Sequence, residues 1–215
     1  MSSTGVRTPP PQPLWRTSPT RLLRLVAGLW IFGMGEGLIV LSALGNSPWT
    51  VFAEGISVQT PLSIGVATIL TGFVIFVAWV PLKVRPGLGT LLNAVLIGVS
   101  LDATLHLVHQ PDGLVLRGLL LAGGIAVVGV GSGLYLGTAH GPGPRDGLMT
   151  GLHRTTRRPI ALVRGLIEIS ALTVGWLLGG TLGLGTVAFA VLIGPAVQAG
   201  LALDRRLWHR ERPPA

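Results

Sequence analysis

The chain of 215 residues contains no cysteine. It therefore has no disulfide bond, no thiol nucleophile and no thiolate ligand for a metal ion. Charged residues are also scarce, at 11% of the chain, whereas a soluble domain usually has about 25%. Only eight residues are acidic against 16 basic ones, which gives a net charge of +8. The shortage of charge argues against an ordinary soluble domain.

Apolar residues and glycine are abundant instead. Hydrophobic residues make up 49% of the chain, the mean hydropathy is +0.66, and there are 32 glycines. Glycine is more frequent in transmembrane helices than in soluble ones. Six apolar stretches are long enough to cross about 30 Å of hydrocarbon as helices, at approximately 22–44, 62–82, 88–107, 115–138, 159–180 and 184–204. The sequence therefore predicts an all-α polytopic membrane protein with six transmembrane helices.

The two halves of the chain resemble each other at a fixed offset of 96 residues. Residues 28–56 match 124–152, and 87–98 match 183–194. Each half contains three spans, so the second half must enter the membrane from the opposite side, an arrangement that many secondary transporters use. We expect a disordered cytoplasmic tail at 1–20, repeat 1 at 21–110, repeat 2 at 111–204 and a second cytoplasmic tail at 205–215.

Basic residues alternate between the segments that connect the spans, and this alternation sets the orientation. The segments after spans 1 and 5 have none, and only Arg117 lies near the connection of spans 3 and 4. The other segments carry Arg7, Arg16, Arg21 and Arg24, then Lys83 and Arg85, then Arg145, Arg154, Arg157 and Arg158, and finally Arg205, Arg206, Arg210 and Arg212. We therefore expect a protein of the bacterial cytoplasmic membrane with both termini in the cytoplasm. Anionic lipids are the expected partner of the basic segments, and nucleic acid is not.

A short helix is predicted after span 1 and another after span 4. Ser47, Pro48 and Trp49 begin the first, and Gly143, Pro144, Arg145 and Asp146 begin the second. Proline suits the first helical position, and Asp146 suits the positive end of the helix dipole. Half-helices whose N-termini point inward often build a site for an anionic group at the midplane. The alternative is a pair of surface helices that only connect spans.

Glycines recur every four residues on spans 1 and 4, at Gly33 and Gly37 and at Gly129, Gly133 and Gly137. Small residues at this spacing let helix backbones approach closely. We expect spans 1 and 4 to cross along these stripes. Trp79 and Trp176 are expected at opposite membrane interfaces, as two inverted copies would place them.

Ionisable residues at membrane depth are expensive, at about 2.5–3.5 kcal/mol each on insertion scales. Glu36 lies near the middle of span 1, and Arg164 and Glu168 lie four residues apart on one face of span 5. We interpret these three as a protonatable or ion-coordinating site between the repeats, or else as a structural bridge that locks the halves together. Arg145 and Asp146 are candidate gate residues.

Four further polar residues lie on spans 3 and 6, namely Asn93, Asp102, His106 and Gln198. Asp102 and His106 are near the outer end of span 3, where water is the expected neighbour. No spacing of histidines and carboxylates matches a zinc motif, so neither a metal nor a cofactor is expected.

Several of these features together resemble the YczE-like family of bacterial integral membrane proteins. They are the Gly-x-Gly-x-Gly-Leu runs, the Ser47-Pro48-Trp49 turn, the Pro144-Arg145-Asp146-Gly147 turn, the Arg164/Glu168 pair and Gly183-Leu184-Gly185-Thr186. The resemblance covers roughly residues 20–204. It implies a polytopic protein of the cytoplasmic membrane, without an assigned substrate or reaction.

The leading functional hypothesis is a small-molecule or ion transporter that works by rocking of two inverted repeats around Glu36, Arg164 and Glu168. The alternative is a scaffold or regulatory partner that binds another protein through the basic segment 140–158 and the tails. No nucleophile–base pair can be assembled from the motifs, so an enzyme is not expected. The sequence leaves the solute, the coupling ion and homo-oligomerisation open.

Overall fold

The computed structural model describes residues 14, 15 and 17–208. This part of the chain is helical and contains no strand. Its eight helices are α1 (Pro19–Ser42), α2 (Pro48–Gln59), α3 (Ile64–Leu82), α4 (Leu88–Leu107), α5 (Leu114–Leu136), α6 (Pro144–Thr156), α7 (Ile160–Leu177) and α8 (Leu184–Trp208). Within the described residues, six of them are long and apolar enough to cross a membrane: α1, α3, α4, α5, α7 and α8.

The spans predicted from the sequence agree with these six helices to within a few residues. The ends of α1 show the local causes: the hydroxyl of Ser18 accepts from the Arg21 amide, Pro19 occupies the first turn, and Ala43 leaves the helix with a φ of 48°. The helices extend into both predicted tails, because α1 already begins at Pro19 and α8 continues to Trp208. Of these two predicted tails, residues 1–13, 16 and 209–215 lie outside the described residues.

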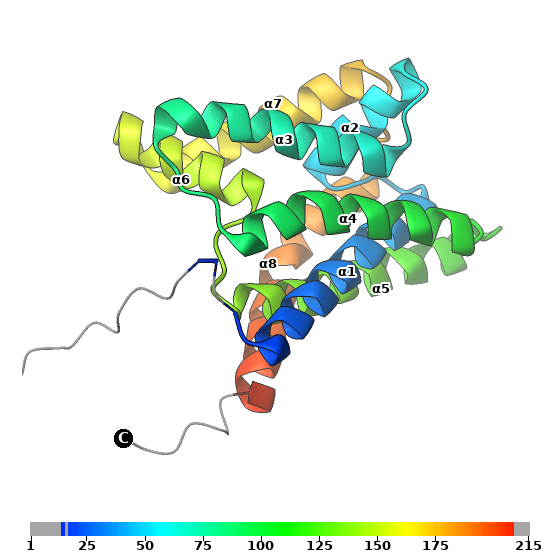
Figure 1. The fold of residues 1–215 in the computed structure, drawn as a ribbon. Coiled ribbons are helices and arrows are strands. Elements are labelled where there is room, and N and C mark those ends of the chain that lie inside the picture. Colours follow the sequence, from blue (N-terminus) through cyan, green and yellow to red (C-terminus); the bar gives the residue numbers. More distant parts are fainter. Residues whose placement is uncertain (1–13, 16, 209–215) are drawn as a thin grey trace, which may run out of the picture.

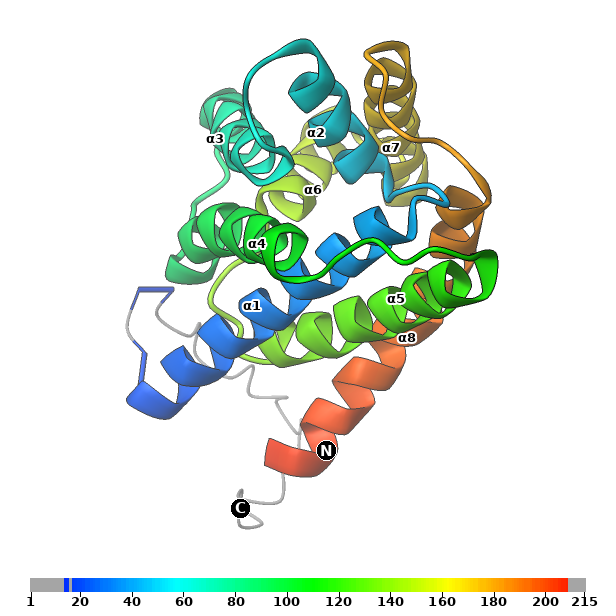
Figure 2. The same cartoon turned by 90° about the vertical axis from the view of Figure 1, so that its right-hand side faces the viewer.

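The helices form two layers (Figures 1 and 2). In one layer α1 and α5 pack against each other, α4 packs on α1, and α8 packs on α5. The other layer contains α3 and α7 with the two short helices, where α2 packs on α7 and α6 packs on α3. Contacts between α3 and α4 join the layers. The short helices thus lie beside the spans of the opposite half of the chain.

Glycines bring α1 and α5 together at backbone distance, but not the glycines predicted. A β-carbon at Gly28 would lie 2.7 Å from the Tyr135 amide nitrogen, and one at Gly131 would lie 2.5 Å from the Phe32 amide nitrogen. Side chains at these positions would push the helices apart. The crossing therefore runs along the Gly28–Gly131 side of α1 and α5.

The predicted stripes face other helices. Gly33 and Gly37 contact α4 at Ile97 and Thr104, and Gly129 and Gly133 contact α8 at Ala196 and Gly200. Gly137 lies against the side chains of Arg24 and Asp204. The expected partner was wrong because spacing shows which residues share a helix face, whereas the topology decides which neighbour that face meets.

The turns that follow α1 and α5 have the same form. Gly45 and Gly141 have φ of +117° and +108°, values that favour glycine. The Leu44 carbonyl accepts from the Gly185 amide at 2.7 Å, and the His140 carbonyl accepts from the Gly89 amide at 3.0 Å. Each turn therefore fixes the start of the short helix against a span of the other half.

Trp79, which is predicted at a membrane interface, is buried within the protein. It is 2% exposed, its ring lies against Gly147, and its Nε1 donates to the Pro144 carbonyl at 3.1 Å. The cause is α6, which covers this end of α3. Trp176, by contrast, is 56% exposed.

Candidate functional site

A cavity of about 320 Å³ lies between the two layers. It is lined by the beginnings of both short helices, the middle of α1 and parts of α3, α4, α5, α7 and α8. The predicted residues that line it are Glu36, Ser47, Pro48, Trp49, Asn93, Pro144, Arg145, Asp146, Arg164 and Glu168. The structure thus brings together side chains from five helices and the turn before α2.

Glu36 is the most deeply buried acidic group of this cavity. It is 2% exposed, and its Oε2 accepts from the hydroxyls of Ser47 and Thr50 at 3.0 and 2.7 Å. Among the residues described, its Oε1 has no hydrogen-bond partner. A buried carboxylate oxygen without a partner is costly. Glu36 therefore brings a buried, unpartnered acceptor to the wall of the cavity.

The N-termini of α2 and α6 both face this cavity. Pro48 and Pro144 occupy their first turns, and neither helix has a side-chain cap on its terminal amides. At Ser47, which precedes α2, the hydroxyl turns to Glu36 instead. Uncapped helix N-termini carry partial positive charge and exposed N–H donors. Such ends favour negative charge: the carboxylate of Glu36 lies beside the start of α2, and that of Asp146 lies in the first turn of α6.

Arg145 lies beside the start of α2. Its guanidinium is 5.0 Å from the centre of the Trp49 ring, a cation–π geometry. It lies within electrostatic range of Glu36, Asp146 and Glu168, yet in the described structure it forms no ion pair. Trp49 is 9% exposed, and its Nε1 donor has no partner among the described residues. Two donors are thus available on this side of the cavity.

Arg164 and Glu168 form an ion pair of 2.9 Å along α7. Their side chains are 60% and 33% exposed, so the pair is open to the surroundings. The sequence groups Arg164 with both Glu36 and Glu168. In the structure Glu36 is held by hydroxyls, and Arg164 pairs with Glu168.

Three of the secondary residues lie away from the cavity. Asp102 accepts from the Gly65 amide at 2.8 Å and from the Ser63 hydroxyl, and so caps α3. His106 is exposed, with its Nδ1 2.8 Å from the Asp102 carbonyl oxygen. Gln198 is exposed on α8. Asn93, on α4, is the one of the four that lines the cavity.

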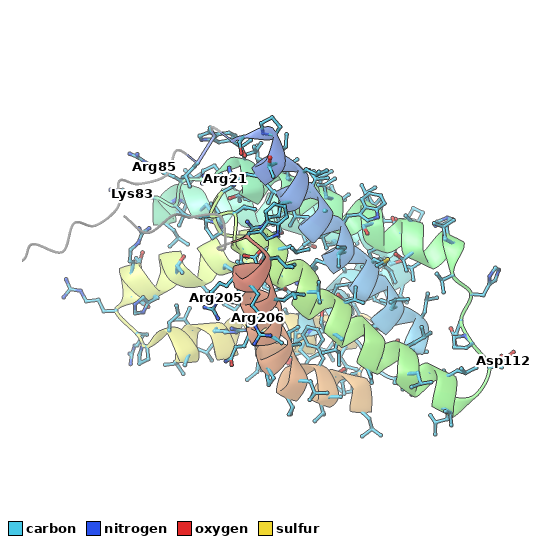
Figure 3. The ribbon with its side chains drawn as sticks, turned by 90° about the horizontal axis from the view of Figure 1, so that it is seen from below. Arg21, Lys83, Arg85, Asp112, Arg205 and Arg206 are labelled. Atoms are coloured by element: carbon cyan, nitrogen blue, oxygen red, sulfur yellow. The ribbon has the colours of Figure 1, made fainter. Side chains whose placement is uncertain are left out.

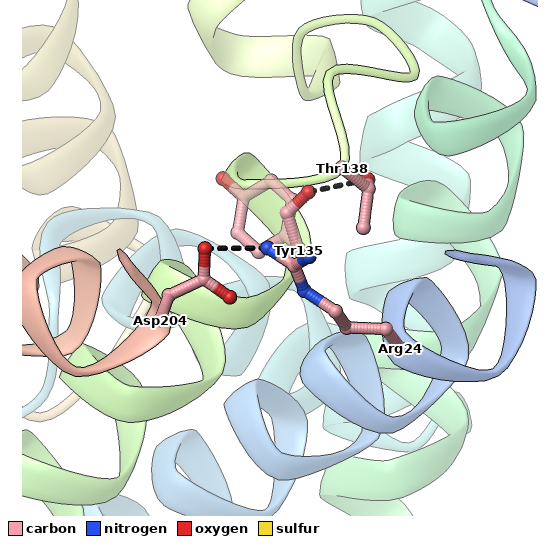
Figure 4. Close-up of polar contacts among 4 residues, drawn as sticks. All are labelled: Arg24, Tyr135, Thr138 and Asp204. Carbon is pink, nitrogen blue, oxygen red and sulfur yellow. Dashed lines mark hydrogen bonds and ion pairs between the residues drawn. The ribbon is translucent and has the colours of Figure 1, made fainter. Parts of the chain in front are cut away.

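Two polar contacts outside the cavity were missed by sequence reasoning. Arg24 of α1 and Asp204 of α8 form a buried ion pair, shown with Tyr135 and Thr138 in Figure 4. Arg24 also lies 5.3 Å from the centre of the Trp208 ring. In the sequence Arg24 is one of several N-terminal arginines, and no local signal separates it from those at the surface.

Glu54 is the second missed residue. It accepts from the Asn46 side chain at 2.8 Å, and from the amide and hydroxyl of Thr181 at 2.6 and 2.8 Å. It thereby ties α2 to the turn before it and to the segment before α8. Only the tertiary fold brings Thr181 to it, since the two lie 127 positions apart.

The fold and the comparisons with known proteins define a multi-pass membrane protein. The chain belongs to a family of unknown function (DUF6198), whose model matches residues 19–200. It is 44% identical to an uncharacterized protein of Haemophilus influenzae over 91% of this chain and 90% of the relative. It is 34% identical to the uncharacterized membrane protein YczE of Bacillus subtilis, over 78% and 79%. The YczE-like resemblance is thereby confirmed.

A third relative, the uncharacterized protein YyaS of Bacillus subtilis, is 26% identical over 83% of this chain and 91% of the relative. No solved structure matches the chain. The comparisons therefore establish the family and its membrane character, and the function has to be argued from the cavity.

Proposed function

We propose that this protein is a transporter that moves a small molecule or ion across the bacterial cytoplasmic membrane. The observation that carries the proposal is the cavity in which Glu36 meets the N-termini of α2 and α6. Short helices whose N-termini meet at one polar cavity are a recurring feature of transporters. A buried carboxylate among membrane-spanning helices is by default a functional group, because its insertion is costly.

We further propose that the two halves are inverted repeats. Contacts in one half have counterparts 96 residues away: Gly33 meets Ser100 as Gly129 meets Ala196, and Gly37 meets Thr104 as Gly133 meets Gly200. The turns at Gly45 and Gly141 also correspond. Since each half contributes three spans, a shared fold requires opposite directions through the membrane.

The distribution of charge supports an orientation with both termini in the cytoplasm. Arg21, Lys83 and Arg85 lie toward one end of the molecule, and Asp112 lies at the other (Figure 3). Basic residues favour the cytoplasmic side, so we assign that end to the cytoplasm. Anionic lipids are then the expected neighbours of these residues.

The tight crossing of α1 and α5 joins the two halves, so their complete separation would be expensive. We therefore place the motion between the layers: α2, α3, α6 and α7 move against α1, α4, α5 and α8. Such rocking of one bundle against another around a fixed site is common in secondary transporters. In this proposal Glu36 stays on the fixed layer and takes up a proton or binds a cation.

Flux in proteoliposomes tests the proposal. We expect purified protein to move protons along an imposed pH gradient, alone or with a panel of amino acids present, as read by a trapped pH-sensitive dye. Glu36→Gln keeps the size of the side chain and can still accept hydrogen bonds from the Ser47 and Thr50 hydroxyls, but it removes the carboxylate. We expect this variant to abolish the flux. The matched control is His106→Gln, which lies outside the cavity and is expected to behave as wild type. Absence of flux, or equal flux in Glu36→Gln, contradicts the proposal.

The alternative function as a scaffold drew on the basic segment 140–158. Much of that segment is the helix α6, which packs on α3 and α7. Arg145 lines the cavity, and Arg154 donates to the Leu82 carbonyl at 3.2 Å. Arg157 and Arg158 remain exposed, so within this segment the surface left for a partner is small, and the tails that this alternative also uses lie mostly outside the described residues.

A further inference from the structure

We infer that the ligand of the cavity is a small organic zwitterion, with an ammonium and a carboxylate on one compact apolar body. The inference rests on the proposed function, because it names the substrate class of the same cavity. It starts from two side chains that are each at least nine-tenths buried and that each have one polar atom without a hydrogen-bond partner among the described residues. They are Glu36, whose Oε1 can only accept while ionised, and Trp49, whose Nε1 can only donate.

The donor side calls for an anionic group. The Trp49 ring, which carries the unpartnered Nε1, and the Arg145 guanidinium lie together, at the start of α2 and the start of α6. The first turn of α2, which has no side-chain cap and no acidic residue, adds N–H donors and partial positive charge, whereas Asp146 supplies a carboxylate to the first turn of α6. A carboxylate accepts from several donors at once, and its charge matches this side of the cavity.

The acceptor side calls for a cationic donor. Ser47 and Thr50 already occupy one oxygen of Glu36 and leave the other free. An ammonium group supplies several N–H donors together with a positive charge. With one pole at Glu36 and the other near Trp49 and Arg145, a single zwitterion satisfies both buried groups.

Single-charge ligands fit the cavity less well. Two cationic side chains, Arg145 and Arg164, face three carboxylates, Glu36, Asp146 and Glu168. A simple anion meets repulsion from these carboxylates, and a simple cation leaves the Trp49 and Arg145 donors unmet. A zwitterion adds no net charge and pairs with both the acceptor and the donors of the cavity. A ligand with a single charge leaves one of these buried groups unpaired and therefore binds more weakly.

The size and the walls of the cavity define the body of the ligand. A volume of about 320 Å³ is at the lower end for ligand sites. Apolar side chains complete the lining, among them Phe32, Ile97, Val128 and Ile193. The ligand is therefore small and carries a hydrophobic group of amino-acid size.

Matched probes test the inference directly. Purified protein is titrated with leucine, methionine, phenylalanine and proline, with binding read by thermal shift and by calorimetry. The best zwitterion is then compared with the amine that lacks its carboxylate and the acid that lacks its amino group. For leucine these are isoamylamine and 4-methylpentanoate. We expect one of the amino acids to bind, and each single-charge analogue to bind at least about tenfold more weakly, which corresponds to about 1.4 kcal/mol.

Variants then assign the two poles. Glu36→Gln is expected to weaken the zwitterion at least about tenfold, whereas the carboxylic acid, which no longer meets the Glu36 charge, should bind at least as well as it binds the wild type. Trp49→Phe keeps the ring beside Arg145 but removes the N–H, and should weaken both the zwitterion and the acid. The thermal transition of each unliganded variant shows that it is folded. Failure of all four amino acids to bind, or equal binding of the acid alone, overturns the inference.

The outcome separates this inference from the proposed function. Ion flux without zwitterion binding leaves the transporter standing and removes the ligand class. Zwitterion binding without any flux keeps the ligand class and removes transport.

Discussion

The first half of the chain closes its side of the cavity, whereas the second half leaves its side open. In the first half α3 packs on α4: a β-carbon at Gly98 would lie 2.4 Å from the Gly65 carbonyl oxygen, and one at Gly72 would lie 3.2 Å from the Ala94 β-carbon. In the second half no comparable packing joins α7 and α8 within the described residues. Gly194, the counterpart of Gly98, has no atom within 4 Å of such a β-carbon.

Several residues of this contact differ between the two halves; for example, Ala161 stands at the position of Gly65. Glu168 stands at the position of Gly72, and Ala190 stands at the position of Ala94. A charged side chain cannot replace a glycine at a backbone contact, because both its volume and its desolvation oppose close packing. The comparison shows that a repeated sequence preserves helices and turns, while exchanges at contact points, such as Glu168 for Gly72, accompany a different packing of the helices.

The largest effect is expected at the ion pair that only one half contains. Arg24 and Asp204 are buried, whereas their counterparts in the repeat are Leu120 and Val108. Asp204→Asn leaves the Arg24 charge buried without its partner, and we expect a loss of about 3–5 kcal/mol in the free energy of unfolding. Thermal unfolding in detergent measures it.

The control for this prediction is the double variant Arg24→Leu with Asp204→Val, which installs the residues of the other half. Replacement of both charges by apolar groups should restore most of the stability. If Asp204→Asn alone is as stable as wild type, the ion pair does not hold α1 to α8.

The next effect compares two glycines with the same place in the repeat. Gly98→Val forces a side chain against the Gly65 carbonyl and should destabilise the protein by about 1–3 kcal/mol more than Gly194→Val. Both residues lie inside helices, but Gly194 precedes Pro195, which adds a cost to Gly194→Val, so the measured difference is a lower limit for the contact at Gly98. Equal melting temperatures for the two variants would show that α4 does not depend on this contact.

Cysteine pairs compare the α3–α4 contact with the α7–α8 gap in the membrane, because the chain has no native cysteine. Gly72→Cys with Ala94→Cys should form a disulfide after a small outward shift of the helices, because their β-carbons would lie 3.2 Å apart and bridged β-carbons lie about 3.5–4.5 Å apart. Glu168→Cys with Ala190→Cys should form one slowly, and faster whenever α7 approaches α8. Gel mobility after mild oxidation reports both rates. Similar rates for the two pairs would remove the asymmetry.

The smallest effect on stability is expected at the ion pair of the open half. Arg164 and Glu168 are 60% and 33% exposed, so Arg164→Gln should change the free energy of unfolding by less than about 1 kcal/mol. The same melting assay checks this. A loss as large as that of Asp204→Asn would mean that the pair is shielded from its surroundings.

Sequence reasoning reached the elements and much of the cavity. The length of each apolar stretch fixed the six long helices, and proline at positions 48 and 144 marked the starts of the two short ones. Because helix depth follows from residue number, Glu36 and Glu168 could be placed near one level. Arg145 and Asp146 could be singled out only as gate residues.

Contacts between distant residues could not be predicted. Arg24 and Asp204 are 180 positions apart, and nothing near either residue signals the other. Tryptophan often marks the end of a membrane helix, and on that basis Trp79 is predicted at an interface, yet α6 covers it. The glycine stripe of Gly33 and Gly37 gave the correct kind of contact with the wrong neighbour. In each case the deciding information is the topology, which local spacing does not contain.

The most direct test of the inverted repeats uses the exposed pair Thr60 and Thr156, which lie 96 residues apart at the ends of α2 and α6. Each is replaced singly by cysteine, and intact cells are treated with a thiol reagent that does not cross the membrane. The account predicts that Thr60→Cys is labelled from outside and that Thr156→Cys is labelled only after the membrane is opened. Labelling of both from the same side would contradict it.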